Sequence, residues 1–73
     1  MAHTRVLSEI NGSVWKIVVK EGDTVAEDDT LAIVESMKME IPVLAPVGGK
    51  VENILVKEGE PITEGVTMMS ISH

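Results

Sequence analysis

Glu35-Ser36-Met37-Lys38-Met39-Glu40 lies at the midpoint of the 73-residue chain and joins two apolar segments, Leu31 to Val34 and Ile41 to Leu44. The apolar flanks predict a strand on each side of it. The stretch contains no Gly, Asn or Pro, the residues that usually form tight turns. A short helix is the competing interpretation, but Pro42 would interrupt it and no helical apolar period continues past it. A turn made of residues that disfavour turns indicates side chains kept for another purpose, and we expect that purpose to be presentation of Lys38.

The sequence on either side of this stretch is an internal repeat. Sliding the chain by 37 positions aligns residues 4–36 with residues 41–73, with 11 identities in 33 positions and no gap. Val19-Lys20-Glu21-Gly22 falls on Val56-Lys57-Glu58-Gly59 in this alignment. The tip, residues 37–40, lies outside the repeat. The pattern is typical of a duplicated structural unit.

The repeat predicts how the chain is arranged in space. Two β-units of this size cannot each bury a core alone, so we expect them to pack face to face about an approximate two-fold axis. The lysine tip then lies at one end of the module and both termini at the other. Met1 to His3 is expected to be a loose end. The predicted strands of the first unit are Thr4 to Ile10, Val14 to Lys20, a short piece at Val25, and Thr30 to Glu35.

Composition limits the fold and the partners of residues 1–73, which have room for a single domain. The chain has no Phe, Tyr or Cys, so its core must come from Val, Ile, Leu and Met, without disulfides or thiolate metal sites. The formal charge of −6 argues against nucleic acid or anionic membrane as a partner. No signal peptide or membrane-spanning run is visible, so we expect a cytoplasmic module. No Ser-His-acid set, metal-ligand cluster or phosphate-binding loop is present, which predicts that the chain is not an enzyme by itself.

Lys38 is the one lysine that lies outside the repeat, so no position in either copy is equivalent to it. Its neighbours Met37 and Met39 cannot both be buried in a tight tip, and exposed Met is normally avoided unless a partner contacts it. The other lysines are interpreted as solvated charge on strands or strand ends: Lys16, Lys20, Lys50 and Lys57.

The motif around Lys38 resembles the E-[SA]-M-K-M motif of the biotinyl domains of biotin-dependent carboxylases. The resemblance covers nearly the whole chain, including Val19 to Val25 before the tip, Ala45 to Val51 after it, and the turns at Gly59 and Gly65. It is strongest to the small free-standing biotin/lipoyl attachment proteins. Since Val14 to Gly22 is uninterrupted, the protruding thumb of some bacterial carriers is absent.

This resemblance implies an all-β fold, a flattened antiparallel β-barrel or sandwich of two four-stranded sheets with a pseudo-two-fold repeat, also called a barrel-sandwich hybrid. It also implies that each sheet is formed by one repeat unit. It implies that a biotin protein ligase attaches biotin to Lys38. The biotin would then carry carboxylate between a biotin carboxylase and a carboxyltransferase subunit. Glu35, Ser36, Met37 and Met39 would be the flanks that the ligase and the carboxylase read. Lysine amines are ordinarily protonated at neutral pH, so the ligase must supply activated biotin and remove the proton.

Two departures from the family pattern stand out. Asp28 replaces the Gly usual in the turn before the lysine strand, whereas the second copy keeps Gly65; Asp tolerates the left-handed region, so the turn should persist at a small cost. The segment Ser8 to Asn11 replaces the Ala-Pro approach that the second copy keeps at Ala45-Pro46.

Two alternatives to a biotin carrier remain open. A lipoyl carrier shares the fold but usually has Asp before the lysine and a small residue after it, so Met on both sides favours biotin over lipoate. An unmodified structural or interaction barrel would carry no adduct at Lys38. The initial Met and compact ends lead us to expect a free-standing protein, and the acidic surface leads us to expect a monomer.

Overall fold

Eight antiparallel strands form the secondary structure of residues 2–73, which are the residues that the computed structural model describes. None of these residues forms a helix, and so none forms a helix long and apolar enough to cross a membrane. The strands are β1 (His3–Leu7), β2 (Gly12–Ile17), β3 (Thr24–Val25), β4 (Thr30–Ser36), β5 (Met39–Leu44), β6 (Gly49–Ile54), β7 (Pro61–Ile62) and β8 (Thr67–Ser72).

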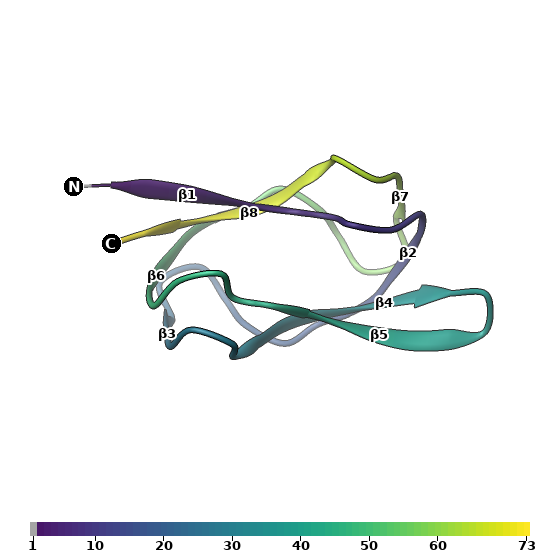
Figure 1. Cartoon of the computed structure of the whole chain (residues 1–73), viewed down its shortest axis with the longest axis horizontal. Helices are drawn as coiled ribbons and strands as arrows, with labels where there is room; N and C mark the ends of the chain where they lie inside the picture. Colours follow the sequence, from purple (N-terminus) through teal and green to yellow (C-terminus); the bar gives the residue numbers. More distant parts are fainter. Residues whose placement is uncertain (1) are drawn as a thin grey trace.

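The strands form two four-stranded sheets, with the orders β1-β8-β6-β3 and β5-β4-β2-β7 (Figure 1). The predicted all-β architecture of two antiparallel sheets is therefore confirmed. The prediction that each sheet comes from one repeat is wrong, because each sheet takes two strands from each copy. Apolar alternation tells which face of a strand is buried but not which strand lies beside it. Each repeat unit contributes two strands to each sheet, so neither sheet is complete without the other unit.

The pseudo-two-fold relation holds for strand order and for local irregularities. Shifting by 37 residues converts β1–β4 into β5–β8, and it converts one sheet order into the other. Register shifts place an extra residue at Trp15 in β2 and at Glu52 in β6, which are equivalent positions. The same holds for Leu31 in β4 and Met68 in β8.

The bulges at Leu31 and Met68 change which side chains face the core. A strand normally alternates its side chains between two faces, but an extra residue lets two neighbours point the same way. Leu31 and the following Ala32 are both fully buried, and so are Met68 and Met69. Each strand thereby contributes consecutive residues to two apolar clusters, which lie at equivalent places in the two halves.

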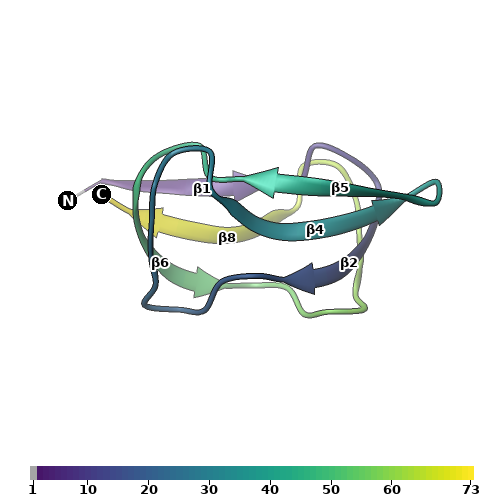
Figure 2. The ribbon, with the colours of Figure 1, turned by 90° about the horizontal axis from the view of Figure 1, so that it is seen from below.

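The lysine hairpin and the termini lie at opposite ends of the long axis, as predicted (Figures 1 and 2). The molecule measures 36 × 18 × 17 Å along its principal axes. At the terminal end, the amide of Ala2 donates to the carbonyl of His73, and the amide of His73 donates back to Ala2, each over 2.9 Å. His3 begins β1 and its imidazole contacts the Glu52 carboxylate, so this part of the predicted loose end is wrong; Met1 lies outside the described residues.

Two predicted strands end earlier than expected. β1 stops at Leu7 because Ser8 turns inward: Ser8 is buried, its hydroxyl donates to the Ile10 carbonyl, and its amide donates to the Val66 carbonyl. Ala45, its equivalent, is also buried and donates to Asp29 in the same way. The unusual approach to Gly12 therefore keeps the geometry of the second copy.

β2 stops at Ile17 instead of Lys20, and the Val18 amide donates to the Leu31 carbonyl over 2.9 Å.

Asp28 adopts the left-handed conformation that the repeat requires. Its φ is 72°, against 92° at the equivalent Gly65, so the prediction of a conserved turn at this position is confirmed. The Asp28 amide donates to Ala45 and the Gly65 amide to Ser8, each over 2.8 Å, so both turns are bonded alike.

Asp28→Gly is expected to raise the free energy of unfolding by about 0.5 kcal/mol. The left-handed region costs an ordinary non-Gly residue ~1–2 kcal/mol and Asp less, and the greater chain entropy of unfolded Gly offsets part of the gain. Urea denaturation of both proteins measures the difference. The mirror variant Gly65→Asp should lower the stability by a similar amount, because no atom lies within 4 Å of a Cβ placed there and the cost is one of backbone conformation alone. A drop in stability for Asp28→Gly would contradict the strain at this turn.

Candidate functional site

The connection between β4 and β5 is a two-residue turn, Met37-Lys38, closed by the pair Ser36 and Met39. Both central residues have positive φ, 52° at Met37 and 65° at Lys38. Positive φ at both positions is the mark of a type I′ turn, which matches the twist of antiparallel strands and normally contains Asn-Gly. The hairpin tip predicted from the sequence is thus present, with Lys38 at its end.

This turn is held in an unfavourable conformation by its surroundings. Each non-Gly residue in the left-handed region costs ~1–2 kcal/mol, and neither Met37 nor Lys38 has the short polar side chain that lowers this cost. The cost is offset by the long pairing of β4 with β5, which continues for five more residue pairs from Glu35–Glu40 to Thr30–Leu44. The barrel therefore enforces a tip that its own residues do not favour.

The side chains of the tip point into solvent. Met37 is 91% exposed, Met39 is 63% exposed, and Lys38 is exposed as well. The core methionines Met68 and Met69, by contrast, are fully buried. The prediction that a tight tip cannot bury both of its methionines is confirmed. Within residues 2–73 the Lys38 amine takes part in no ion pair, so it is free to meet a partner.

The base of the hairpin is tied to the loop between β1 and β2. The Ser36 hydroxyl donates to the Asn11 carbonyl over 2.8 Å, and the Asn11 side-chain oxygen accepts from the Glu64 amide over 2.8 Å. Asn11 thereby links the tip to loops of both repeats. Sequence reasoning noted Asn11 only as the end of the segment that departs from the family pattern. Its partners are 25 and 53 residues away along the chain, and no local pattern identifies them.

Glu35 and Glu40 face each other directly across the two strands next to the tip. Like charges at such positions repel, which adds to the local cost and leaves a negative surface beside Lys38. The five residues predicted for the site, Glu35, Ser36, Met37, Lys38 and Met39, therefore lie together on one projecting hairpin. The Lys38 amine makes no ion pair among the described residues. The arrangement can present an amine to a partner.

Comparison with known protein sequences relates this hairpin to a family. Residues 6–71 match the Biotin_lipoyl family model, described as biotin-requiring enzyme. The biotinylated protein TB7.3 homolog of Mycolicibacterium smegmatis is 62% identical over 39 residues, which are 53% of this chain and 55% of that protein. The biotin/lipoyl attachment protein of Bacillus subtilis is 47% identical over 36 residues, 49% of each chain. The matched part thus spans about half the length of these relatives.

Comparison with solved structures gives the same fold. The Kluyveromyces lactis urea carboxylase contains a region that superposes with a TM-score of 0.92 and 36% identity, covering 99% of this chain and 6% of that one. A single-chain, multi-domain long-chain acyl-CoA carboxylase superposes with a TM-score of 0.87 at 22% identity, over 93% of this chain and 7% of that one. The second likeness concerns the fold alone. In both proteins the similar region is a small part of a much larger chain.

Proposed function

Because the chain belongs to the Biotin_lipoyl family of biotin-requiring enzymes, we propose that it is a biotin carboxyl carrier whose Lys38 amine bears the biotin through an amide bond. The observation that carries this proposal is the tip geometry: one lysine, exposed and without an ion-pair partner within residues 2–73, in a strained two-residue turn at the far end of the molecule. An exposed primary amine is the group that forms an amide bond with the carboxyl group of such a cofactor. The tip provides one, since nothing within residues 2–73 covers the Lys38 side chain.

The residues around Lys38 have separate roles in this proposal. Ser36 holds the hairpin through its bond to Asn11, so that the lysine is presented at a fixed place. Met37 and Met39 offer flexible, polarisable side chains that a ligase and a carboxylase can both contact. Glu35 adds a negative charge for a basic surface on such partners.

The chain's own contribution is to position and tether. When bound, biotin supplies the ureido nitrogen that accepts and releases carboxylate. The barrel holds that cofactor at one end and leaves the other end, with both termini, free for attachment to an assembly (Figure 1). A tethered carrier visits two active sites at a high effective concentration without free diffusion of the intermediate. The partners that fit are a biotin protein ligase and the biotin carboxylase and carboxyltransferase subunits of a biotin-dependent carboxylase. In this proposal the carrier is a cytoplasmic monomer, and its partners perform the catalysis.

The test is the intact mass of the protein after incubation with a biotin protein ligase, ATP and biotin, followed by peptide mapping. We expect a single gain equal to biotin minus water, located in the peptide that contains Lys38. A gain only with a lipoate ligase and lipoate would replace biotin by lipoate. No gain with either ligase would overturn the carrier proposal and leave an unmodified barrel.

Met37→Asn is expected to change stability and ligation in opposite directions. Asn is favoured at this position of a type I′ turn, so the free energy of unfolding should rise by about 0.5–1 kcal/mol. If the ligase contacts the thioether, kcat/KM for biotinylation should fall about tenfold, which corresponds to ~1.4 kcal/mol of lost contact. Urea denaturation and initial rates of biotin incorporation measure the two effects.

The matched control for this variant is Met37→Leu. It keeps an apolar side chain of similar size, and so it should retain both the stability and most of the ligation rate. Ligation of Met37→Asn at the wild-type rate would show that the ligase does not read this side chain.

A further inference from the structure

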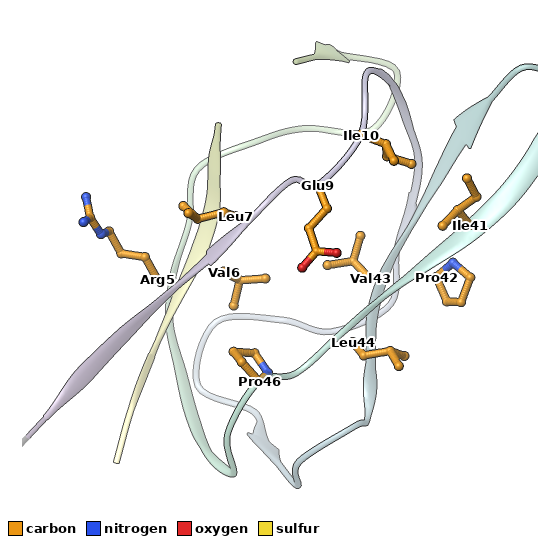
Figure 3. Close-up of a pocket in the computed structure, with 10 residues that line it drawn as sticks. All are labelled: Arg5, Val6, Leu7, Glu9, Ile10, Ile41, Pro42, Val43, Leu44 and Pro46. Carbon is orange, nitrogen blue, oxygen red and sulfur yellow. The ribbon is translucent and has the colours of Figure 1, made fainter. Parts of the chain in front are cut away.

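A groove of about 330 Å³ opens between β1 and β5 (Figure 3). These are edge strands of the two sheets, and they do not pair with each other. Its volume lies at the small end of the range for ligand pockets, ~300–1,000 Å³. Val6 and Val43, which are equivalent in the two repeats, line its middle, and Ile10 and Ile41 lie at the end toward the β4–β5 hairpin (Figure 3). The groove therefore sits on the pseudo-two-fold axis with apolar walls from both halves.

The apolar surface of the groove is continuous with the lysine tip. Alternate residues of a strand share a face, so Met39, Ile41 and Val43 form one line along β5. This is the inner face, because Ile41 pairs with the buried Val34 and Val43 with the buried Ala32. Ile41 is the third residue after Lys38, which is about 10 Å along a strand. A lysine lengthened by an acyl chain can span that distance.

Two charged side chains line the groove, Arg5 and Glu9, and Figure 3 shows the Arg5 guanidinium directed away from it. Figure 3 shows the Glu9 carboxylate between Val6 and Val43. Among the described residues it accepts no hydrogen bond and has no ion-pair partner, since the one ion pair found there joins His3 to Glu52. A carboxylate is an acceptor-only group, so it pairs with an N–H donor. The groove thus combines apolar walls with one free carboxylate.

We propose that this groove is a resting site for the biotin carried by Lys38, an inference that rests on the proposed function. The alkyl chain and the sulfur-containing ring lie along Ile41 and Val43, and one ureido N–H group donates to the Glu9 carboxylate. Biotin has both features that the groove selects, an apolar body and an N–H donor on its ureido ring. The Glu9 carboxylate excludes a second carboxylate, and so it favours biotin that carries no carboxyl group.

The tether makes a weak site sufficient. A short flexible linker gives an effective concentration of about millimolar, so a groove with only millimolar affinity for free biotin amide holds the arm about half of the time. Such a site still releases the arm readily to a partner. The resting position keeps the ring out of water between visits without preventing transfer.

Methyl NMR spectra of the whole protein, with and without biotin on Lys38, test the proposal. Intact mass first establishes that each sample is fully and singly modified. We expect shift changes at the methyls of Ile10, Ile41 and Val43, together with nuclear Overhauser contacts from the biotin ring to these groups. The rate of capture by streptavidin should be reduced about twofold relative to a freely extended arm.

Two variants separate the groove from a general charge effect. Glu9→Ala should at least halve the shift changes and restore the capture rate. Glu27→Ala removes the same charge from an exposed corner outside the groove, and it should change neither.

The outcomes distinguish this inference from the function on which it rests. A fully biotinylated protein whose shift changes are confined to residues 36–40 would overturn the resting site and leave the carrier function intact. Shift changes in the groove that are equal in wild type and Glu9→Ala would overturn the part assigned to Glu9. Absence of biotin from Lys38 in the mass spectrum would overturn the proposed function, and the resting site with it.

Discussion

Lys38→Arg abolishes biotin incorporation: this is the expected result with the largest effect on function. Arginine keeps the positive charge and much of the length of the side chain, but its guanidinium is a far poorer nucleophile than a lysine amine and stays protonated. The backbone cost is unchanged, because Arg at φ 65° meets the same left-handed strain as Lys. Incorporation measured by intact mass should fall below detection, while urea denaturation stays within ~0.5 kcal/mol of wild type.

Lys50→Arg is the matched control for this prediction. Lys50 lies in β6 and is exposed, so the same chemical change at this site should leave both stability and biotin incorporation unchanged. Full incorporation in Lys38→Arg, with the mass found on Lys50 or another lysine, would contradict the assignment of the acceptor.

The largest expected effect on stability comes from Gly49→Ala at the start of β6. A Cβ at Gly49 would lie 2.2 Å from the carbonyl oxygen of Ser72 and 2.8 Å from Cγ2 of Ile71. The first of these is a backbone atom of the paired strand β8, so it cannot move aside without breaking the β6–β8 pairing. The cost should reach about 3 kcal/mol, at the upper end for overpacking. That lowers Tm by roughly 10–20 °C for a domain of this size, as measured by calorimetry.

The neighbouring Gly48 gives the control. A Cβ there would lie 3.5 Å from its nearest neighbour, the Val25 carbonyl oxygen, which is an ordinary contact. Gly48→Ala should therefore stay within ~0.5 kcal/mol of wild type. Equal stability of the two Ala variants would show that the approach of β6 to β8 is looser than described.

The repeat made much of the fold predictable from the sequence. A duplication places a tip and a pair of termini at opposite ends, and it anticipates that Asp28 takes the conformation of Gly65, as found. The exchange of strands between the sheets was not predictable, because apolar alternation identifies a buried face without identifying a neighbour. The two consecutive buried residues at Leu31-Ala32 depend on a bulge, which a strict alternation pattern cannot indicate.

The position of the candidate site followed from the sequence, but its support did not. The absence of turn residues around Lys38 predicted an enforced tip, and the positive φ values of Met37 and Lys38 agree with it. The bonds through Asn11 and the groove beside Glu9 come from segments that are distant along the chain. Such features arise only when the strands are in place. The role of Lys38 as acceptor stays a prediction for the experiments above.

The paired amides and carbonyls of Ala2 and His73 make the chain ends a hairpin that lacks only its turn. Shifted by 37 residues, these two positions fall on Met39 and Ser36, the pair that closes the lysine turn. Two residues joining His73 to Ala2 would thus close the chain into a ring with a hairpin at each end. A ring opened between Met37 and Lys38 is a circular permutant that keeps every strand pair, and a lysine in the new turn would face the opposite way. In such a barrel the lysine turn lies at the end opposite the chain break, so the position of the break decides which end carries the cofactor.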